Sequence, residues 1–249
     1  MHVRIQAKGH RSTSNPFGVI FHPWALQKNC ELIAQSIDRK HFDSFFKPTD
    51  IYFHRDIYHS LQHANRFQHS NKVQLMEDLY SMAHQAHHAL KEAGIIAITL
   101  GTAWLYNHKP SGTFVGNCHK LPQQDFEKIL STQSIIQNQI LGILRAIQQI
   151  NTKAPIVFTV SPVRHLRDGV SENLRSKSTL ISALTEVLAN HEPNLHYFPA
   201  YEIVREELND WRYYTEDKMH PTPEAINIVF DRFYKALFST NDSTSEAVL

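Results

Sequence analysis

The fold of this chain is decided at residues 94–101, which read Gly-Ile-Ile-Ala-Ile-Thr-Leu-Gly. A short apolar, β-branched run between two glycines is typical of a strand rather than of a helix. Because the run is continuous and not alternating, it predicts a strand buried on both faces, as in a parallel sheet covered by helices. The chain leaves this strand at Gly101, which we therefore expect at the carboxyl end of a sheet.

The segments on either side repeat a unit of helix followed by strand. Residues 71–93 carry apolar side chains at helical spacing, and Asn71 can cap that helix. A second helical pattern covers 126–150 and leads to a second buried strand at 156–160. Further helices are expected at 24–37, 171–188, 202–209 and 222–238, and a third strand at 195–200. This alternation predicts an α/β fold with one parallel sheet between layers of helices.

The composition is that of an ordinary globular chain with one domain. It has 249 residues, 42% of them hydrophobic, which suffices for one sizeable core. Its 25 Lys and Arg nearly balance 24 Asp and Glu, so charge points neither to nucleic acid nor to a membrane surface. The N terminus lacks the apolar core of a secretion signal, and Cys30 and Cys118 are too few for a disulfide framework. We expect a cytoplasmic protein with no nucleic-acid or membrane partner.

Polar residues follow the predicted strands at the edge where open parallel sheets bind ligands. Gly101 ends the first strand, Arg164 and His165 follow the second, and Asp217 with His220 lies beyond the third. A carboxylate three residues before a histidine can hold one imidazole nitrogen, which leaves the other free as a general base toward a hydroxyl. The alternative is that Asp217 caps a turn and His220 is a surface residue.

Arg164 and Cys118 each allow two interpretations. Arg164 can bind the carboxylate or phosphate of a substrate, or it can form a salt bridge to Asp168 or Glu202. Cys118 can be a nucleophile beside a histidine, or a small buried apolar residue.

The chain contains 17 histidines, which raises the question of a metal site. His59 and His63 are four residues apart, and a second group comprises His84, His87 and His88. Neither group has the glutamate of the H-E-x-x-H zinc motif, and neither follows a strand. We therefore expect no metal site, and we assign His84, His87 and His88 to a solvated face, while a role at the rim of the site stays open for His63.

Six motifs resemble the GSCFA family, in the order in which they follow each other along the chain. They are Asn15-Pro16-Phe17-Gly18, Leu100-Gly101-Thr102-Ala103-Trp104, Asn117-Cys118-His119-Lys120, Thr159-Val160-Ser161-Pro162-Val163-Arg164-His165, Phe198-Pro199-Ala200-Tyr201-Glu202 and Asp217-x-x-His220-Pro221. That family looks like a branch of the SGNH/GDSL hydrolase superfamily. The resemblance implies a three-layer helix, parallel sheet, helix architecture of flavodoxin-like type and a Ser-His-Asp mechanism without a cofactor.

The resemblance also implies roles for single residues. Asp217 and His220 match the final acid–base pair, and Gly101 matches a glycine whose N–H faces an oxyanion. The asparagine of the superfamily's G-x-N-D motif is absent after Gly101, and Asn117 is our hypothesis for a substitute donor. Arg164 and His165 are expected on the substrate-binding side.

One segment departs from the family. The family is named for a Gly-Ser-Cys-Phe-Ala motif after a first buried strand, and residues 1–14 contain neither. We expect an irregular N-terminus over 1–14, a domain over 15–238 and a loose tail over 239–249. We also expect the strand at 95–100 to expose an edge, and the chain to be truncated and inactive. The expected activity of the family type is ester or acyl hydrolysis on a small molecule, and the alternative is a non-catalytic binding domain on the same fold.

Overall fold

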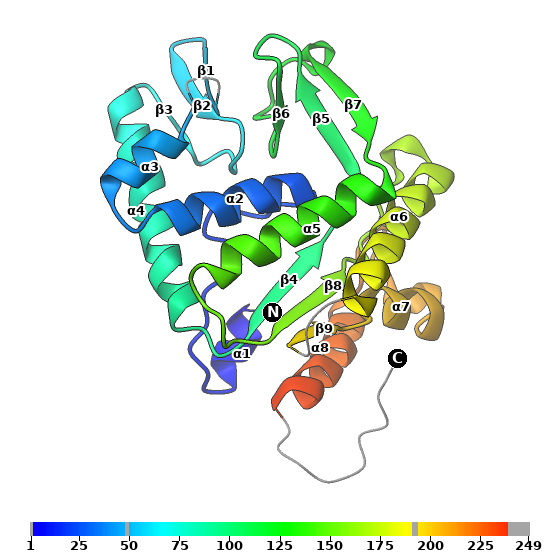
Figure 1. Ribbon diagram of the computed structural model, residues 1–249. Helices are drawn as coiled ribbons and strands as arrows, with labels where there is room; N and C mark the ends of the chain where they lie inside the picture. Colours follow the sequence, from blue (N-terminus) through cyan, green and yellow to red (C-terminus); the bar gives the residue numbers. More distant parts are fainter. Residues whose placement is uncertain (1, 48–49, 191–193, 239–249) are drawn as a thin grey trace.

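The computed structural model describes residues 2–47, 50–190 and 194–238, and it confirms a mixed α/β fold (Figure 1). The helices are α1 (His2–Ala7), α2 (Pro23–Gln35), α3 (Arg39–Phe45), α4 (Lys72–Lys91), α5 (Gln133–Gln148), α6 (Val170–Ala189), α7 (Ala200–Glu202) and α8 (Pro223–Phe238). The strands are β1 (Ile51–His54), β2 (Ile57–Ser60), β3 (Gln68–His69), β4 (Ile96–Leu100), β5 (Trp104–His108), β6 (Thr113–Val115), β7 (Phe126–Leu130), β8 (Ile156–Val160) and β9 (Leu195–Tyr197).

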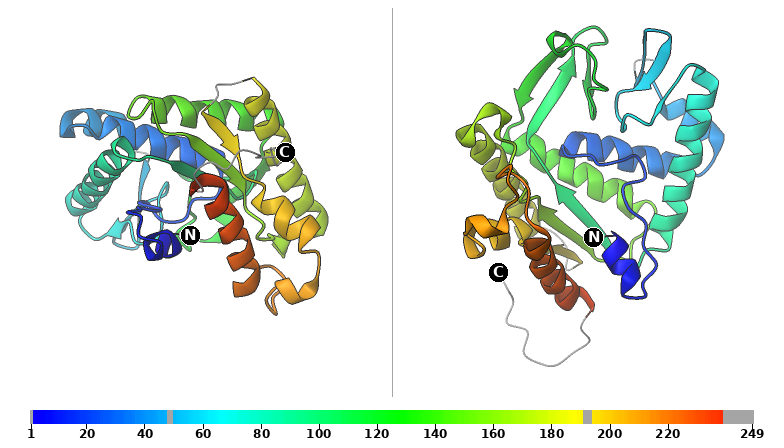
Figure 2. Two further views of the ribbon diagram at one scale, coloured as in Figure 1. Left: turned by 90° about the horizontal axis from the view of Figure 1, so that it is seen from below. Right: turned by 180° about the vertical axis from the view of Figure 1, so that it is seen from behind.

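The predicted parallel sheet is present, with strand order β4-β8-β9. On one face, Ile98 and Phe158 pack under α5 and α6 in the largest apolar cluster. On the other face, Val157 and Phe198 pack against α8, and Ile5 of α1 joins that cluster. Helices thus lie on both faces of the sheet, as Figure 2 shows from two sides. In the described part of the chain, no helix is long and apolar enough to cross a membrane.

The first two strands of the parallel sheet, β4 and β8, differ in burial, although their sequences look alike. Every residue of β8 is buried, as predicted. In β4 the prediction of burial on both faces is wrong, because Ala97 and Thr99 are exposed while their neighbours are buried. α8 packs over Val157 of β8, and β4 has a strand neighbour on one side only. The expected exposed edge of this strand is therefore present.

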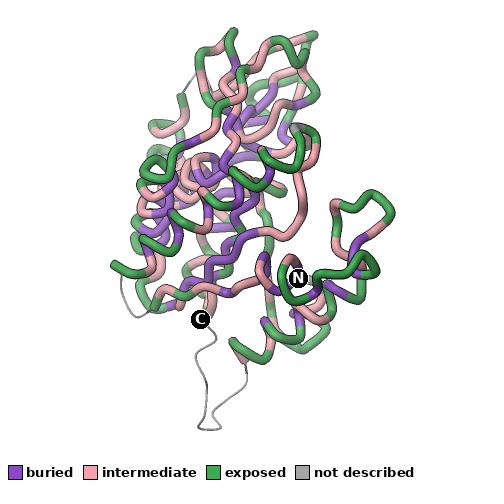
Figure 3. Tube along the Cα trace, turned by 90° about the vertical axis from the view of Figure 1, so that its right-hand side faces the viewer, coloured by how far each residue is buried: buried purple, intermediate pink, exposed green. Residues whose placement is uncertain are grey.

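Figure 3 shows the buried residues running through the interior of the molecule, with the exposed residues at its rim.

The segment 126–130 is a strand and not the first turn of a helix, which corrects the predicted helix over 126–150. β7 pairs antiparallel with β5, and β5 pairs with β6, so that the three strands form a separate sheet. Residues 126–130 alternate between half-buried and exposed side chains, which is the two-residue period of a strand. The helix begins only after Thr132, whose hydroxyl accepts a hydrogen bond from Ile135 N–H.

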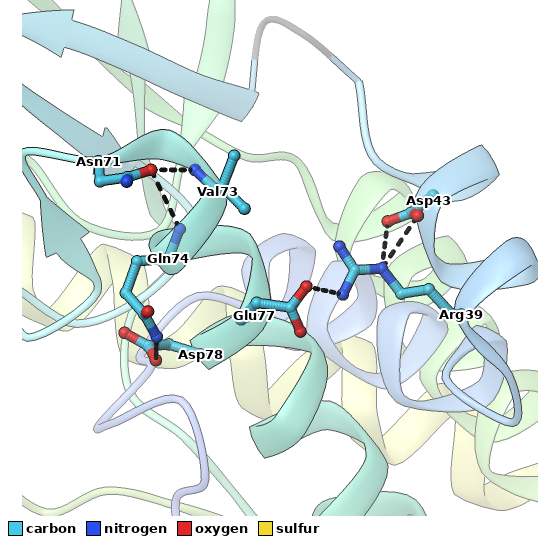
Figure 4. A network of polar contacts seen from close by, with 7 residues as sticks. All are labelled: Arg39, Asp43, Asn71, Val73, Gln74, Glu77 and Asp78. Carbon is cyan, nitrogen blue, oxygen red and sulfur yellow. Dashed lines mark hydrogen bonds and ion pairs between the residues drawn. The ribbon is translucent and has the colours of Figure 1, made fainter.

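A third sheet, with strand order β1-β2-β3, lies beside α3 and α4 (Figure 1). Asn71 caps α4 as predicted, because its Oδ1 accepts the N–H groups of Val73 and Gln74. Figure 4 shows this cap together with Arg39 of α3, which binds Asp43 in its own helix and Glu77 of α4. These ion pairs tie α3 to α4 at the surface.

Both ends of the chain were predicted to lack regular structure. At the N-terminus, residues 2–7 form the short helix α1. The predicted tail, 239–249, lies outside the described residues. The division into 1–14, 15–238 and 239–249 remains a prediction.

Gly18, in the Asn-Pro-Phe-Gly turn, cannot be replaced without steric conflict. Its φ is 87°, and a Cβ there would lie 2.3 Å from Ala64 Cβ. Gly9 is a matched control, because its φ is 86° and a Cβ would meet nothing within 4 Å.

We expect Gly9→Ala to lower the free energy of unfolding by about 1–2 kcal/mol, because of its left-handed backbone conformation alone. Gly18→Ala should cost about 1–3 kcal/mol more, because overpacking adds to the backbone term. Urea denaturation measures both, and equal losses would contradict the close contact.

Candidate active site

The Asp217–His220 pair forms the geometry expected of an acid–base pair. Asp217 Oδ2 lies 2.6 Å from His220 Nδ1, so Nδ1 is the nitrogen that the carboxylate holds. Oδ1 of the same carboxylate accepts hydrogen bonds from the Thr215 hydroxyl at 2.6 Å and from Met219 N–H at 2.8 Å. The Thr215 hydroxyl and then the His220 ring hold the pKa of Asp217 well below its usual range. Asp217 is therefore a carboxylate at neutral pH.

The second ring nitrogen of His220 is open to a ligand. The side chain is 57% exposed, and within the described residues no hydrogen bond uses Nε2. No serine or threonine hydroxyl in that part of the chain is bound to Nε2. His220 is therefore an oriented imidazole, and no hydroxyl of the residues that the structure describes is hydrogen-bonded to its Nε2.

A second pair in the chain shows that spacing alone does not identify a site. Asp38 and His41 are also three residues apart, and Asp38 Oδ2 lies 2.7 Å from His41 Nδ1. Asp38 is the N-cap of α3, on the surface away from the parallel sheet. What distinguishes Asp217 and His220 is therefore their position and not their local geometry.

The loop after β8 holds the Asp217–His220 loop in place. Arg164 N–H donates to Met219 O at 3.2 Å, and the Arg164 guanidinium lies 4.3 Å from the Tyr214 ring centroid. Trp211 lies on the same guanidinium, at 5.0 Å. Of the two predicted ion-pair partners, Glu202 instead accepts from the Tyr197 hydroxyl, and the Asp168 side chain lies outside the described residues. Two of the sequence-predicted elements, Arg164 and the Asp217–His220 pair, are thus brought together.

Gly101 and His165 meet through Phe21. Gly101 N–H donates to Phe21 O at 2.8 Å, and the His165 ring lies 5.8 Å from the Phe21 ring, edge to face. The N–H that the resemblance assigned to an oxyanion is thus occupied by a main-chain carbonyl. In this conformation Gly101 N–H is not free to face an oxyanion, and it fixes the Phe21 loop beside β4.

Asn117 lies on the side of the β1-β2-β3 sheet. Its N–H donates to Leu61 O, and its Oδ1 accepts from His119 N–H at 2.8 Å. In the described residues no hydrogen bond joins it to Gly101, Arg164 or His220. The rest of that loop does approach the loop after β8, because Arg167 donates to Gln123 Oε1 at 2.7 Å.

Cys118, in the same loop, is not a thiolate at neutral pH. Burial raises the pKa of its thiol to about 11. Of its two interpretations, the structure favours the small apolar residue over the nucleophile.

Sequence reasoning missed Lys177, the one lysine in the buried face of α6. It is 1% exposed, and its Nζ donates to Gly101 O at 2.6 Å and to Ser161 O at 2.7 Å. It therefore joins the ends of β4 and β8, and burial lowers its pKa to about 7. The sequence does indicate that Lys177 is buried, because it stands three residues before Leu180 and seven before Leu184, on the apolar stripe of the helix.

His63, for which a role at the rim of the site was open, is instead buried beside β2. His63 is 1% exposed, and its Nδ1 lies 2.6 Å from the Ser60 hydroxyl, which is fully buried. Burial lowers the pKa of His63 to about 3. This Ser–His pair resembles half of a catalytic triad, but both side chains are enclosed and serve packing.

The comparison with known families covers nearly all of the chain. The model of the GSCFA family matches residues 1–233, so that the match begins upstream of the first motif at Asn15. No curated protein matches the chain.

Proposed function

The chain belongs to the GSCFA family, and on that premise we propose that it carries the acid–base half of a serine-hydrolase site. His220 is the general base, Asp217 orients it, and the fold is that of an SGNH-type hydrolase acting on a small ester or acyl substrate without a cofactor. The observation that carries the proposal is the position of this oriented pair beside the loop after β8, where Arg164 N–H donates to Met219 O at 3.2 Å and Asp217 holds His220 Nδ1 at 2.6 Å. A carboxylate that fixes one nitrogen stabilises the imidazolium formed when the other takes a proton.

Arg164 and His165 are the substrate-binding side of the proposed site. Arg164 stands against the Asp217–His220 loop, and its guanidinium is a donor suited to an anionic group on the substrate. Asn117 receives no role in the proposed chemistry, because its loop is bonded to Leu61 on the side of the β1-β2-β3 sheet. The free cysteines, Cys30 and Cys118, support a reducing, cytoplasmic setting.

The nucleophile is the missing element of this proposal. No hydroxyl in the described residues is bound to His220 Nε2, and triad members act as a unit. We expect residues 1–249 alone to hydrolyse esters no faster than background. The alternative function, a non-catalytic domain that binds a small acyl ligand, is favoured by this same absence of a bound hydroxyl.

The test is ester hydrolysis by a version of the chain extended upstream to carry the family's Gly-Ser-Cys-Phe-Ala segment. Hydrolysis of a p-nitrophenyl ester should fall about 10³-fold or more in His220→Ala and in Asp217→Asn. The matched controls are His41→Ala and Asp38→Asn, which change the equivalent surface pair in α3. The controls should stay within about twofold of the parent.

The outcomes separate the two functions. Loss in the Asp217 and His220 variants alone supports the hydrolase. Equal rates in all four variants would contradict the assignment of the base. An extended chain that never exceeds background would favour the binding domain.

A further inference from the structure

Two cationic side chains lie over one exposed indole ring beside the proposed base. The Arg164 guanidinium is 5.0 Å from the centroid of the Trp211 ring, and Lys218 Nζ is 5.3 Å from the centroid of the same ring. The two charges are therefore on the order of 10 Å apart or closer, which is about one Debye length at 0.1 M salt. Trp211 itself is 60% exposed. We call Arg164, Trp211 and Lys218 the cationic cluster.

The position of the Arg164 guanidinium is fixed by Tyr214 on the buried side of the cluster. The guanidinium lies 4.3 Å from the Tyr214 ring centroid, and Tyr214 is 7% exposed. The Tyr214 hydroxyl donates to Val204 O at 3.3 Å and accepts from Arg205 Nη1 at 3.1 Å. An arginine that lies over a ring held in this way loses little side-chain freedom when it binds a ligand.

Most hydrogen-bond donors of the Arg164 side chain are unused. A guanidinium carries five N–H donors, and the aromatic rings offer none of them a lone pair. In the part of the chain that the structure describes, the side chain donates once, from Nη1 to Lys218 O at a long 3.4 Å, and Nε is enclosed without a partner. The donors that a ligand can use are therefore those of Nη1 and Nη2. Paired N–H groups of this kind match the two oxygens of a carboxylate or a phosphate.

Neither cation of the cluster has a carboxylate partner among the side chains that the structure describes. Two acidic residues close in the sequence are engaged elsewhere, Asp217 with His220 and Asp210 with Arg212. Glu216 is exposed, and it forms no ion pair within the described residues. Like charges held over one ring repel each other, and a bound anion relieves that repulsion. The charges of the cluster therefore favour an anionic ligand.

The cluster lies on the same loop as the proposed base. Lys218 stands between Asp217 and His220 in the sequence, and its φ is 55°, so the chain turns sharply there. The loop after β8 is joined to this turn because Arg164 N–H donates to Met219 O at 3.2 Å. A small molecule whose anionic group is bound by the cluster can therefore place a second group at His220.

From this arrangement we infer that the substrate of the proposed site carries an anionic group, a carboxylate or a phosphate, which Arg164 and Lys218 bind. Trp211 positions the two cations and thereby sets the preference for an anionic over a neutral substrate. The inference rests on the proposed hydrolase function, and it narrows the substrate class from small esters in general to esters with a negative charge. Binding of the anion itself requires no hydrolysis, so it can be tested separately.

The first experiment measures binding to residues 1–249 by calorimetry. The anionic probes are monomethyl glutarate and methyl phosphate, and the neutral probe is dimethyl glutarate. We expect at least one anionic probe to bind about tenfold or more tightly than the neutral probe, because charge-assisted hydrogen bonds to a guanidinium are stronger than neutral ones. The preference should shrink as NaCl is added. The anion that binds more tightly shows whether the site is suited to a carboxylate or to a phosphate.

Variants of the cluster assign the preference to its residues. Arg164→Met should weaken binding of the preferred anion about tenfold, and Lys218→Met and Trp211→Ala should each weaken it about threefold or more. Lys218 is exposed, so Lys218→Met tests the cluster without removing a buried group. Arg212→Met is the matched control, because Arg212 belongs to the same segment but lies over Tyr213, and it should bind as the wild type does. No preference for either anion, or an equal loss in Arg212→Met, would overturn the inference.

The second experiment separates this inference from the proposed function. The extended chain is given mono-p-nitrophenyl glutarate, which is anionic, and p-nitrophenyl valerate, which is neutral. We expect kcat/KM to be about tenfold or more higher for the anionic ester, and Trp211→Ala to raise KM for the anionic ester more than for the neutral one. Equal hydrolysis of both esters would overturn the inference while the hydrolase stands. Hydrolysis of neither ester would contradict the proposed function, and the calorimetry then decides this inference alone.

Discussion

Raising the pH from 7 to 8.5 is expected to stabilise this chain by about 2 kcal/mol through Lys177 alone. Lys177 is buried at the ends of β4 and β8, and burial lowers its pKa to about 7. In the unfolded chain the pKa of a lysine is about 10.4. Between these values the unfolded state binds more protons, so the free energy of unfolding rises by about 1.4 kcal/mol per pH unit.

The bonding of Lys177 agrees with a neutral amine. A neutral amine has two N–H groups, and Nζ has two acceptors, Gly101 O and Ser161 O. Above about pH 8.5 the two cysteines oppose the effect, because burial raises their thiol pKa values and the unfolded state then loses protons first. Within the window from pH 7 to 8.5 the thiols and the buried histidines also contribute to the slope, so the comparison with a variant at Lys177 isolates its contribution.

Urea denaturation at several pH values in that window measures the slope. We expect it to flatten in Lys177→Met, which keeps the length of the side chain but cannot titrate. Lys153→Met is the control, because Lys153 is exposed, and it should keep the wild-type slope. An unchanged slope in Lys177→Met would show that the buried amine stays charged.

The second large effect concerns Phe158, at the centre of the parallel sheet. Its side chain is fully buried in β8, in the cluster that α5 and α6 cover. Phe158→Ala should lower the free energy of unfolding by about 3–5 kcal/mol, because it removes apolar contact and leaves a cavity. A loss of this size is a large fraction of a typical domain's stability.

Phe53→Ala is the matched control, because Phe53 is 51% exposed on β1. It should cost no more than about 0.5 kcal/mol. Denaturant unfolding compares the two, and similar losses would contradict the central position of β8.

The sequence predicted the parallel sheet because its strands are continuous apolar runs between helices. It failed at β4, since periodicity cannot tell whether a helix covers a face, and Ala97 and Thr99 remain open. It also failed at 126–130, where Phe126 and Ile129 fit a helical pattern as well as a strand. Residues 126–130 form a strand because they pair with β5, and local periodicity does not reveal a contact so distant in the sequence.

The candidate site was predictable in part. The D-x-x-H spacing marked Asp217 and His220, but Asp38 and His41 have the same spacing, and only the fold separates the two pairs. Lys177 was visible as a charge on an apolar stripe. No sequence pattern predicts which polar groups hydrogen-bond to each other, for example that Gly101 N–H donates to Phe21 O.

The most direct measurement of the central claim is labelling with a fluorophosphonate probe, which reacts with an activated serine. The probe is applied to residues 1–249 and to the version extended with a Gly-Ser-Cys-Phe-Ala segment. We expect the extended version alone to be labelled, and His220→Ala to abolish that labelling while His41→Ala does not. Labelling of residues 1–249, or undiminished labelling of the extended His220→Ala variant, would contradict the assignment of His220 as the base that acts on a serine of the added segment.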